Sequence, residues 1–197
     1  MTRQRVLLIV ACVIGALVAA GLAWRVGVFG GGEPPAAVGG PFQLVDQTGR
    51  PADETLLKGK WNAVFFGYTY CPDVCPGTLQ ALIATSDQLG PRAADLRIVF
   101  MSIDPDRDRP AAIRDWLRAN GAPAGTVGLT GTPQQVAGVV KAYRAYAARR
   151  GDGATYLMDH SSAIYLMGPD GRFRRVLAYG MTPDQMAEQI RAAMRDD

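Results

Sequence analysis

Three side chains in this sequence could act together on a metal ion or on a disulfide. Cys71 and Cys75 lie in the segment 67–77, GYTYCPDVCPG, and each is followed by a proline. If this segment is helical, residues i and i+4 share a face, so both sulfurs can converge on one metal ion. The spacing is not the Cys-x-x-Cys of dithiol redox motifs, and two cysteines lack the four ligands of a closed zinc site. Metal binding and redox chemistry both remain open on the cysteines alone.

His160 is the candidate third member of this group and the one histidine among the 197 residues. A lone histidine is usually an ordinary surface or core residue. It becomes a ligand only if folding brings it to the cysteines, which lie 85 or more positions upstream. Two thiolates and an imidazole would leave a coordination position open, and these soft donors suit copper as Cu(I) or Cu(II).

The surrounding sequence predicts the elements that would position these residues. Short apolar runs at 42–45, 62–68, 96–103, 163–167 and 173–179 are typical of strands, the last two forming a hairpin. Segments with helical spacing of apolar residues cover 78–89, 110–119, the stretch that follows Thr132-Pro133, and the stretch that follows Thr182-Pro183.

This order of elements predicts an α/β fold with a thioredoxin-like central sheet and helices on both faces. Cys71 and Cys75 would then follow the carboxyl end of a central strand, at a helix start, where open α/β sheets place their chemistry. The loop that enters strand 163–167 approaches the same edge, so His160 can face both sulfurs. Since a helix N-terminus favours negative charge, we expect the pKa values of both thiols to be lowered.

Three aspartates are candidates to support this group from outside. Asp159 could accept the imidazole N–H of His160, or be a solvated loop carboxylate. Asp73 lies inside the cysteine loop and could tune the site, recognise a partner or cap the helix. Asp104 ends a buried strand, and it either points to the same sheet edge or caps the turn into Pro105.

The first 40 residues predict a membrane anchor and a tether. Residues 6–24 form a 19-residue run without a charge, close to the roughly 20 residues that span a bilayer. Arg3 and Arg5 precede this run, so residues 1–5 should be a cytoplasmic tail and the folded domain should face the periplasm or another extracytoplasmic space. A cleaved secretory signal is the alternative. Residues 25–40 contain six glycines and two prolines and are expected to be a flexible linker to the domain, residues 41–197.

The charge distribution argues against nucleic acid as a partner. The formal net charge of +3 comes from Arg3, Arg5 and Arg25, because basic and acidic residues are equal in number from Glu33 onwards. A neutral domain with scattered arginines lacks the basic face that nucleic-acid binding requires.

Four stretches of the sequence resemble, in order and spacing, the Sco/SenC family of copper-binding proteins. They are GGPFQLVDQTG (39–49), KGKWNAVFFGYTYCPDVCP (58–76), VFMSIDPDRDRP (99–110) and YLMDHSSAIYLMGPDGRF (156–173). The resemblance implies a thioredoxin-like fold on an N-terminal membrane anchor, and copper ligands at Cys71, Cys75 and His160. It also implies a role in assembling the dinuclear copper centre of cytochrome c oxidase subunit II. Residues 107–110 read RDRP where the family often has RDTP, a change in a helix-entry loop.

The leading hypothesis is therefore a membrane-anchored copper metallochaperone rather than an enzyme. It would carry one copper ion per domain from an upstream copper donor to subunit II. The alternative is a thiol–disulfide oxidoreductase in which Cys71 and Cys75 reduce the client's copper-ligand cysteines. A peroxidase would need an arginine beside its reactive cysteine, and none is local to Cys71 in the sequence.

Overall fold

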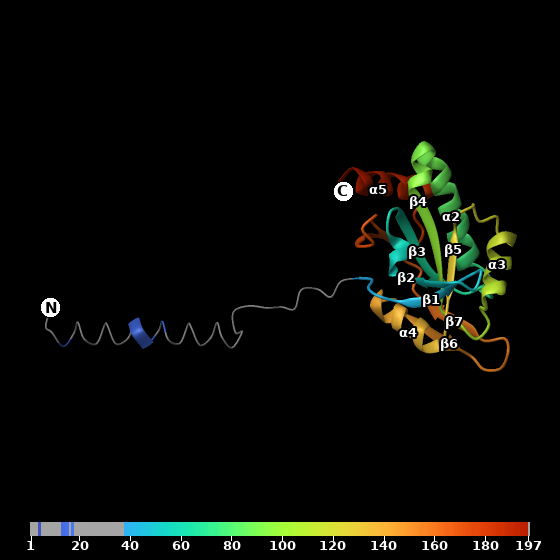
Figure 1. The fold of residues 1–197 in the computed structure, drawn as a ribbon, viewed down its shortest axis with the longest axis horizontal. Helices are drawn as coiled ribbons and strands as arrows, with labels where there is room; N and C mark the ends of the chain where they lie inside the picture. Colours follow the sequence, from blue (N-terminus) through green and yellow to red (C-terminus); the bar gives the residue numbers. More distant parts are fainter. Residues whose placement is uncertain (1–3, 5–12, 16, 18–37, 197) are drawn as a thin grey trace. The chain divides into compact units, whose positions relative to one another are not determined.

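The computed structural model describes Gln4, residues 13–15, residue 17 and residues 38–196 (Figure 1). The chain divides into two compact units, residues 1–37 and 38–197. Most of the predicted anchor, residues 6–24, and of the predicted linker, residues 25–40, lies outside the described residues. Among those that are described, no helix is long and apolar enough to cross a bilayer.

The second unit is built on a seven-stranded mixed sheet (Figure 1). From one edge to the other, the strands are β2 (Pro51–Asp53), β1 (Gln43–Asp46), β5 (Val127–Thr130), β4 (Leu96–Ser102), β3 (Trp61–Gly67), β8 (Ile164–Met167) and β9 (Phe173–Leu177). The three central strands β5, β4 and β3 run parallel, whereas β1 and β8 pair antiparallel to their neighbours. All seven residues of β3 are buried, as expected for a strand covered on both faces.

Helices cover both faces of this sheet and create two cores. Alternate residues of β3 point to opposite faces, with Phe65 in one core and Phe66 in the other. Helices α2 (Val74–Leu89), α3 (Pro110–Ala119) and α5 (Pro183–Asp196) pack on the Phe65 side, and α4 (Pro133–Ala142) packs on the Phe66 side. Figure 1 shows α4 and α5 on opposite sides of the sheet. The predicted α/β fold, with helices on both faces, is therefore confirmed.

A separate two-stranded sheet of β6 (Ala147–Arg150) and β7 (Leu157–His160) stands apart from the main sheet. We call the segment from β6 to β7 the histidine hairpin, because His160 is its last residue. Two 3₁₀ turns, η1 (Glu54–Leu57) and η2 (Gly90–Asp95), complete the second unit.

The sequence reasoning missed the strands β2, β5, β6 and β7. For α2 it recognised helical spacing over 78–89 and placed Cys75 in or just before the first helical turn. Each missed strand has three or four residues and lacks the continuous apolar run that marks the equally short β8. The helix begins at Val74, because Pro76 is tolerated in the first turn, where its missing N–H has no helical partner. Cys75 is consequently the second residue of α2.

Candidate metal centre

The cysteine loop, residues 68–73, connects the end of β3 to the start of α2. It turns back at once, because the Cys71 N–H donates to the Tyr68 carbonyl at 3.2 Å. Cys71 is half-buried, whereas Cys75 is only 1% exposed and packs in the core on the Phe66 side. β3 ends at Gly67, where a Cβ would lie 2.7 Å from the Cys75 sulfur. A glycine at this position therefore lets the buried thiol sit against the strand.

The histidine hairpin brings His160 to the cysteines. Its Nε2 lies 3.5 Å from the Cys75 Sγ. Its Nδ1 lies 2.9 Å from the carbonyl oxygen of Ser161, and a carbonyl can only accept, so we assign the ring proton to Nδ1. Nε2 then presents its lone pair to the sulfurs, as a metal-binding imidazole requires.

The three donor atoms of Cys71, Cys75 and His160 all lie within 4.8 Å of one another. Two ligands bound to one ion at about 2.0–2.3 Å lie at most about 4.6 Å apart, so these donor atoms need little or no movement to share a metal ion. The spatial arrangement expected from the sequence is therefore present: the lone imidazole reaches both sulfurs.

The two cysteines share one negative charge unequally. The hydrogen bond from the Cys75 thiol, helped by backbone N–H groups, lowers the pKa of Cys71 to about 5. One of these N–H groups belongs to Cys75 and lies 3.3 Å from the Cys71 sulfur. The same thiol pair and burial raise the pKa of Cys75. The expectation that the pKa values of both thiols are lowered thus holds for Cys71 and is wrong for Cys75, because the hydrogen bond with Cys71 and burial both disfavour the Cys75 thiolate.

The three predicted supporting aspartates occupy different environments. Asp159 is exposed and lies 3.6 Å from Arg150, while the Ser161 carbonyl takes the imidazole N–H in its place. Asp73 is exposed at the position before α2 and makes no capping hydrogen bond with its side chain. Asp104 is 3% exposed and receives hydrogen bonds from Arg107 and Tyr156.

Sequence reasoning missed a second buried carboxylate close to the cysteine loop. Asp108 is fully buried and accepts the backbone N–H and the hydroxyl of Thr69, as well as the hydroxyl of Ser102. Burial raises the pKa of this carboxyl. Asp108 was missed because it stands two residues before Pro110, like an ordinary residue at the start of a helix, and because its partner Thr69 is 39 positions away in the sequence.

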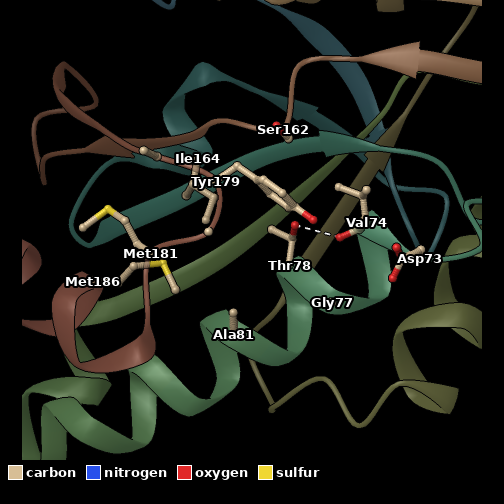
Figure 2. Close-up of a pocket in the computed structure, with 12 residues that line it drawn as sticks. Asp73, Val74, Gly77, Thr78, Ala81, Ser162, Ile164, Tyr179, Met181 and Met186 are labelled. Atoms are coloured by element: carbon tan, nitrogen blue, oxygen red, sulfur yellow. Dashed lines mark hydrogen bonds between the residues drawn. The ribbon is translucent and has the colours of Figure 1, made fainter.

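Beside the metal centre, a groove of about 240 Å³ lies between the start of α2 and the loop that follows β9 (Figure 2). Tyr179 extends from that loop across the first turns of α2, and Met181 and Met186 line the far end. Asp73 and Tyr179 line both this groove and the depression that contains Cys71 and His160. The metal centre is thus accessible from a surface that continues into an apolar groove.

Comparisons with known proteins agree with this geometry. Residues 31–195 match the family model described as SCO1/SenC. Protein SenC of Rhodobacter capsulatus is 40% identical over 163 residues, which are 82% of this chain and 72% of SenC. The mitochondrial SCO1 homologue of Homo sapiens is 36% identical over 162 residues, and the matched region is about half, 53%, of its length. The copper-bound structure of ScoI from Bradyrhizobium japonicum matches 80% of this chain and 99% of its own, with a TM-score of 0.72 and 40% identity.

The fold and the site together define a thioredoxin-like domain with a partly buried Cys-Cys-His group that could hold a metal ion. The chain belongs to the SCO1/SenC family. This membership confirms the resemblance that the four sequence stretches indicated.

Proposed function

We propose that this chain is a copper metallochaperone that binds one copper ion through Cys71, Cys75 and His160. The observation that carries the proposal is the convergence of two sulfurs and an imidazole nitrogen within 4.8 Å. Two thiolates and one imidazole form a soft donor set that favours Cu(I), which accepts three ligands, and that also holds Cu(II). The relative ScoI was solved with copper bound, which supports copper as the cargo.

The site is built to release its cargo as well as to hold it. Cys71 is a thiolate at neutral pH and is half-buried, so it can meet an incoming ion before Cys75 loses its proton. Three ligands leave one side of the ion free for a thiolate of the client. Copper can then pass by stepwise ligand exchange, without ever being released to water.

We propose cytochrome c oxidase subunit II as the client, and its dinuclear copper centre as the destination. An upstream donor would load the chaperone. The anchor at residues 6–24 would keep the domain on the extracytoplasmic side of the same membrane as the oxidase. Such tethering raises the effective concentration of the chaperone near its client.

A substitution of the histidine tests the ligand assignment. We expect the purified 197-residue chain to bind one copper ion and to show a sulfur-to-copper charge-transfer band as Cu(II). His160→Ala should bind copper at least about 100-fold more weakly. Removing a hydrogen-bond partner of a metal ligand costs about 10- to 100-fold in affinity, and removing the ligand itself should cost more. Asp159→Ala is the matched control, because its side chain faces Arg150 and should leave affinity unchanged. Equal affinity in His160→Ala and the wild type would exclude the assignment.

Delivery is tested separately by mixing the copper-loaded chain with the copper-free soluble domain of subunit II. The expected result is loss of copper from the chaperone and appearance of the dinuclear centre's own absorption. If the client domain stays empty while a small thiol chelator extracts the copper, subunit II is not the recipient.

The second candidate function is a thiol–disulfide oxidoreductase that reduces the client's cysteines. The difference between the pKa values of the two cysteines favours this function. A Cys71 thiolate of low pKa next to a protonated Cys75 is the arrangement of an attacking and a resolving thiol. Cys71 would attack a client disulfide, and Cys75 would then resolve the mixed disulfide, leaving a Cys71–Cys75 disulfide and a reduced client. His160 has no role in this reaction, so His160→Ala should still reduce oxidised subunit II, whereas Cys71→Ser should not.

A further inference from the structure

The histidine hairpin is attached to the rest of the domain without strand pairing to the main sheet. In the part of the chain that the structure describes, β7 pairs only with β6, and neither strand is hydrogen-bonded to the main sheet. Residues 161–163 connect His160 to β8, which fixes one end of β7. No strand pairing among the described residues fixes the other end, so a contact outside the sheets must help to set the distance between His160 and the cysteines.

Residues 103–109, between β4 and α3, supply that contact, and we call them the bridging loop. Asp104 accepts the Tyr156 hydroxyl at 2.5 Å, and Tyr156 is the residue immediately before β7. The Arg107 guanidinium lies 3.6 Å from the centre of the Tyr156 ring and donates to the Tyr156 carbonyl at 3.0 Å. Both the backbone and the side chain of Tyr156 are therefore held by the bridging loop.

The bridging loop also holds the cysteine loop. Asp108 accepts the Thr69 hydroxyl at 2.6 Å and the Thr69 N–H at 3.1 Å, two residues before Cys71. Arg107 lies 4.6 Å from the ring centre of Tyr70 and 5.7 Å from that of Tyr68, the two neighbours of Thr69. One guanidinium thus contacts both segments that carry metal ligands.

The burial of these charges distinguishes the bridging loop from ordinary surface ion pairs. Asp104 and Asp108 are 3% and 0% exposed, and the Arg107 side chain is 14% exposed. Burying charged groups is costly unless hydrogen bonds replace their hydration. Apart from the Arg107–Asp104 pair and the Ser102 hydroxyl on Asp108, the hydrogen bonds of these side chains go to the cysteine loop or the histidine hairpin. The geometry of the two segments is therefore tied to hydrogen bonds with charged groups, which are stronger than hydrogen bonds between neutral groups.

We propose that the bridging loop sets the position of His160 relative to the two sulfurs, with Arg107 as the positioning residue. The loop contributes no ligand. It joins the two ligand-bearing segments, so that the Nε2–Sγ distance is fixed before copper arrives. The test by copper affinity rests on the proposed function. The test by the position of the His160 ring is made on the copper-free chain and does not.

Arg107 and Arg149 both lie against the Tyr156 ring, so substitutions of these two arginines form a matched pair for the test. Arg149 lies 3.8 Å from the centre of the Tyr156 ring, but it is exposed, and its hydrogen bond goes to the Gly153 carbonyl of the histidine hairpin itself. We expect Arg107→Gln to lose nuclear Overhauser contacts between the His160 and Tyr68 rings in the reduced, copper-free chain. Arg149→Gln should keep them. These rings lie 6.0 Å apart in an edge-to-face arrangement, which makes the contact observable.

Copper binding gives the second readout. Arg107→Gln should bind copper about 10- to 100-fold more weakly and with a shifted charge-transfer band, as found when the supports of metal ligands are removed. Arg149→Gln should remain within twofold of the wild type. Unchanged ring contacts and affinity in Arg107→Gln, or equal losses in the two variants, would overturn the proposal.

A milder variant covers the case in which Arg107→Gln fails to fold. Tyr156→Phe keeps the stacked ring and removes only the hydroxyl that reaches Asp104. It should weaken copper binding at least threefold and broaden the His160 ring resonances, and wild-type behaviour in both respects would refute the proposal. If the wild type itself binds no copper, the proposed function fails, and the ring contacts alone then decide whether the bridging loop positions His160.

Discussion

Substitution of Gly67 by alanine should displace the buried Cys75 sulfur and weaken the metal centre. The added Cβ would lie 2.7 Å from the Cys75 Sγ, 3.3 Å from its Cβ and 3.1 Å from a ring carbon of Phe100. Normal contacts between carbon atoms are about 3.5–4.0 Å, so the sulfur must move by about 1 Å. Since Cys75 is fixed by the first turn of α2, this movement must change the distance of 3.5 Å between Sγ and the His160 Nε2.

The expected cost is about 1–3 kcal/mol of unfolding free energy, the usual range for overpacking a core. Copper affinity should fall about 10-fold or more, as for other changes that misplace a ligand. The control is Gly138→Ala in α4, where an added Cβ meets nothing within 4 Å. This control should gain about 0.5–1 kcal/mol, because alanine is the better helix former.

Urea unfolding of the copper-free chain measures the first effect, and competition with a copper chelator measures the second. A double-mutant cycle identifies the sulfur as the cause. In a Cys75→Ala background the 2.7 Å contact is absent, so Gly67→Ala should cost less than half as much there. Equal costs in the two backgrounds would refute this account of Gly67.

Three further predictions concern single groups. The copper-free chain should be alkylated at Cys71 with a midpoint near pH 5, because its pKa is lowered to about 5, and a midpoint near the ordinary cysteine value of about 8.5 would contradict the shared charge. The pKa of Asp108 is raised by folding, so between about pH 4 and the folded pKa the folded chain binds more protons than the unfolded chain. The free energy of unfolding therefore falls as the pH rises through this window. Asp108→Asn removes this dependence. The unfolding free energy of Asp108→Asn minus that of the wild type, measured by urea titration, should therefore increase from about pH 4 to pH 7, and a difference that stays constant with pH would contradict the prediction. Tyr143 is fully buried and its hydroxyl has no hydrogen-bond partner among the described residues, so Tyr143→Phe should raise the unfolding free energy by about 1 kcal/mol, measured by urea titration.

The central part of the fold could be predicted because its signals are local. The runs that form β3 and β4 are apolar throughout, and the capping box of α4 at Thr132 and Gln135 marks a helix start within four residues. The short strands lacked such signals. β5 has four residues and includes Gly128, where a Cβ would collide with Ile113 of α3, so packing rather than strand propensity selects that residue.

The candidate ligands were predictable and their supports were not. Two cysteines and one histidine are rare residue types, so their convergence could be inferred from the order of the elements. The group that holds the imidazole is a backbone carbonyl of Ser161, and every residue has a carbonyl, so no sequence signal marks it. The contacts of Asp108 and Tyr156 span 39 and 52 positions, and only the folded chain reveals them.

The hydrogen bond from the His160 ring to the carbonyl of the very next residue has a consequence for how this side chain can behave. Its partner is covalently attached, one peptide unit away, so the bond needs no other part of the protein. The proton therefore stays on Nδ1 wherever this short segment lies. The Nε2 lone pair is kept free for a metal ion by the local backbone alone.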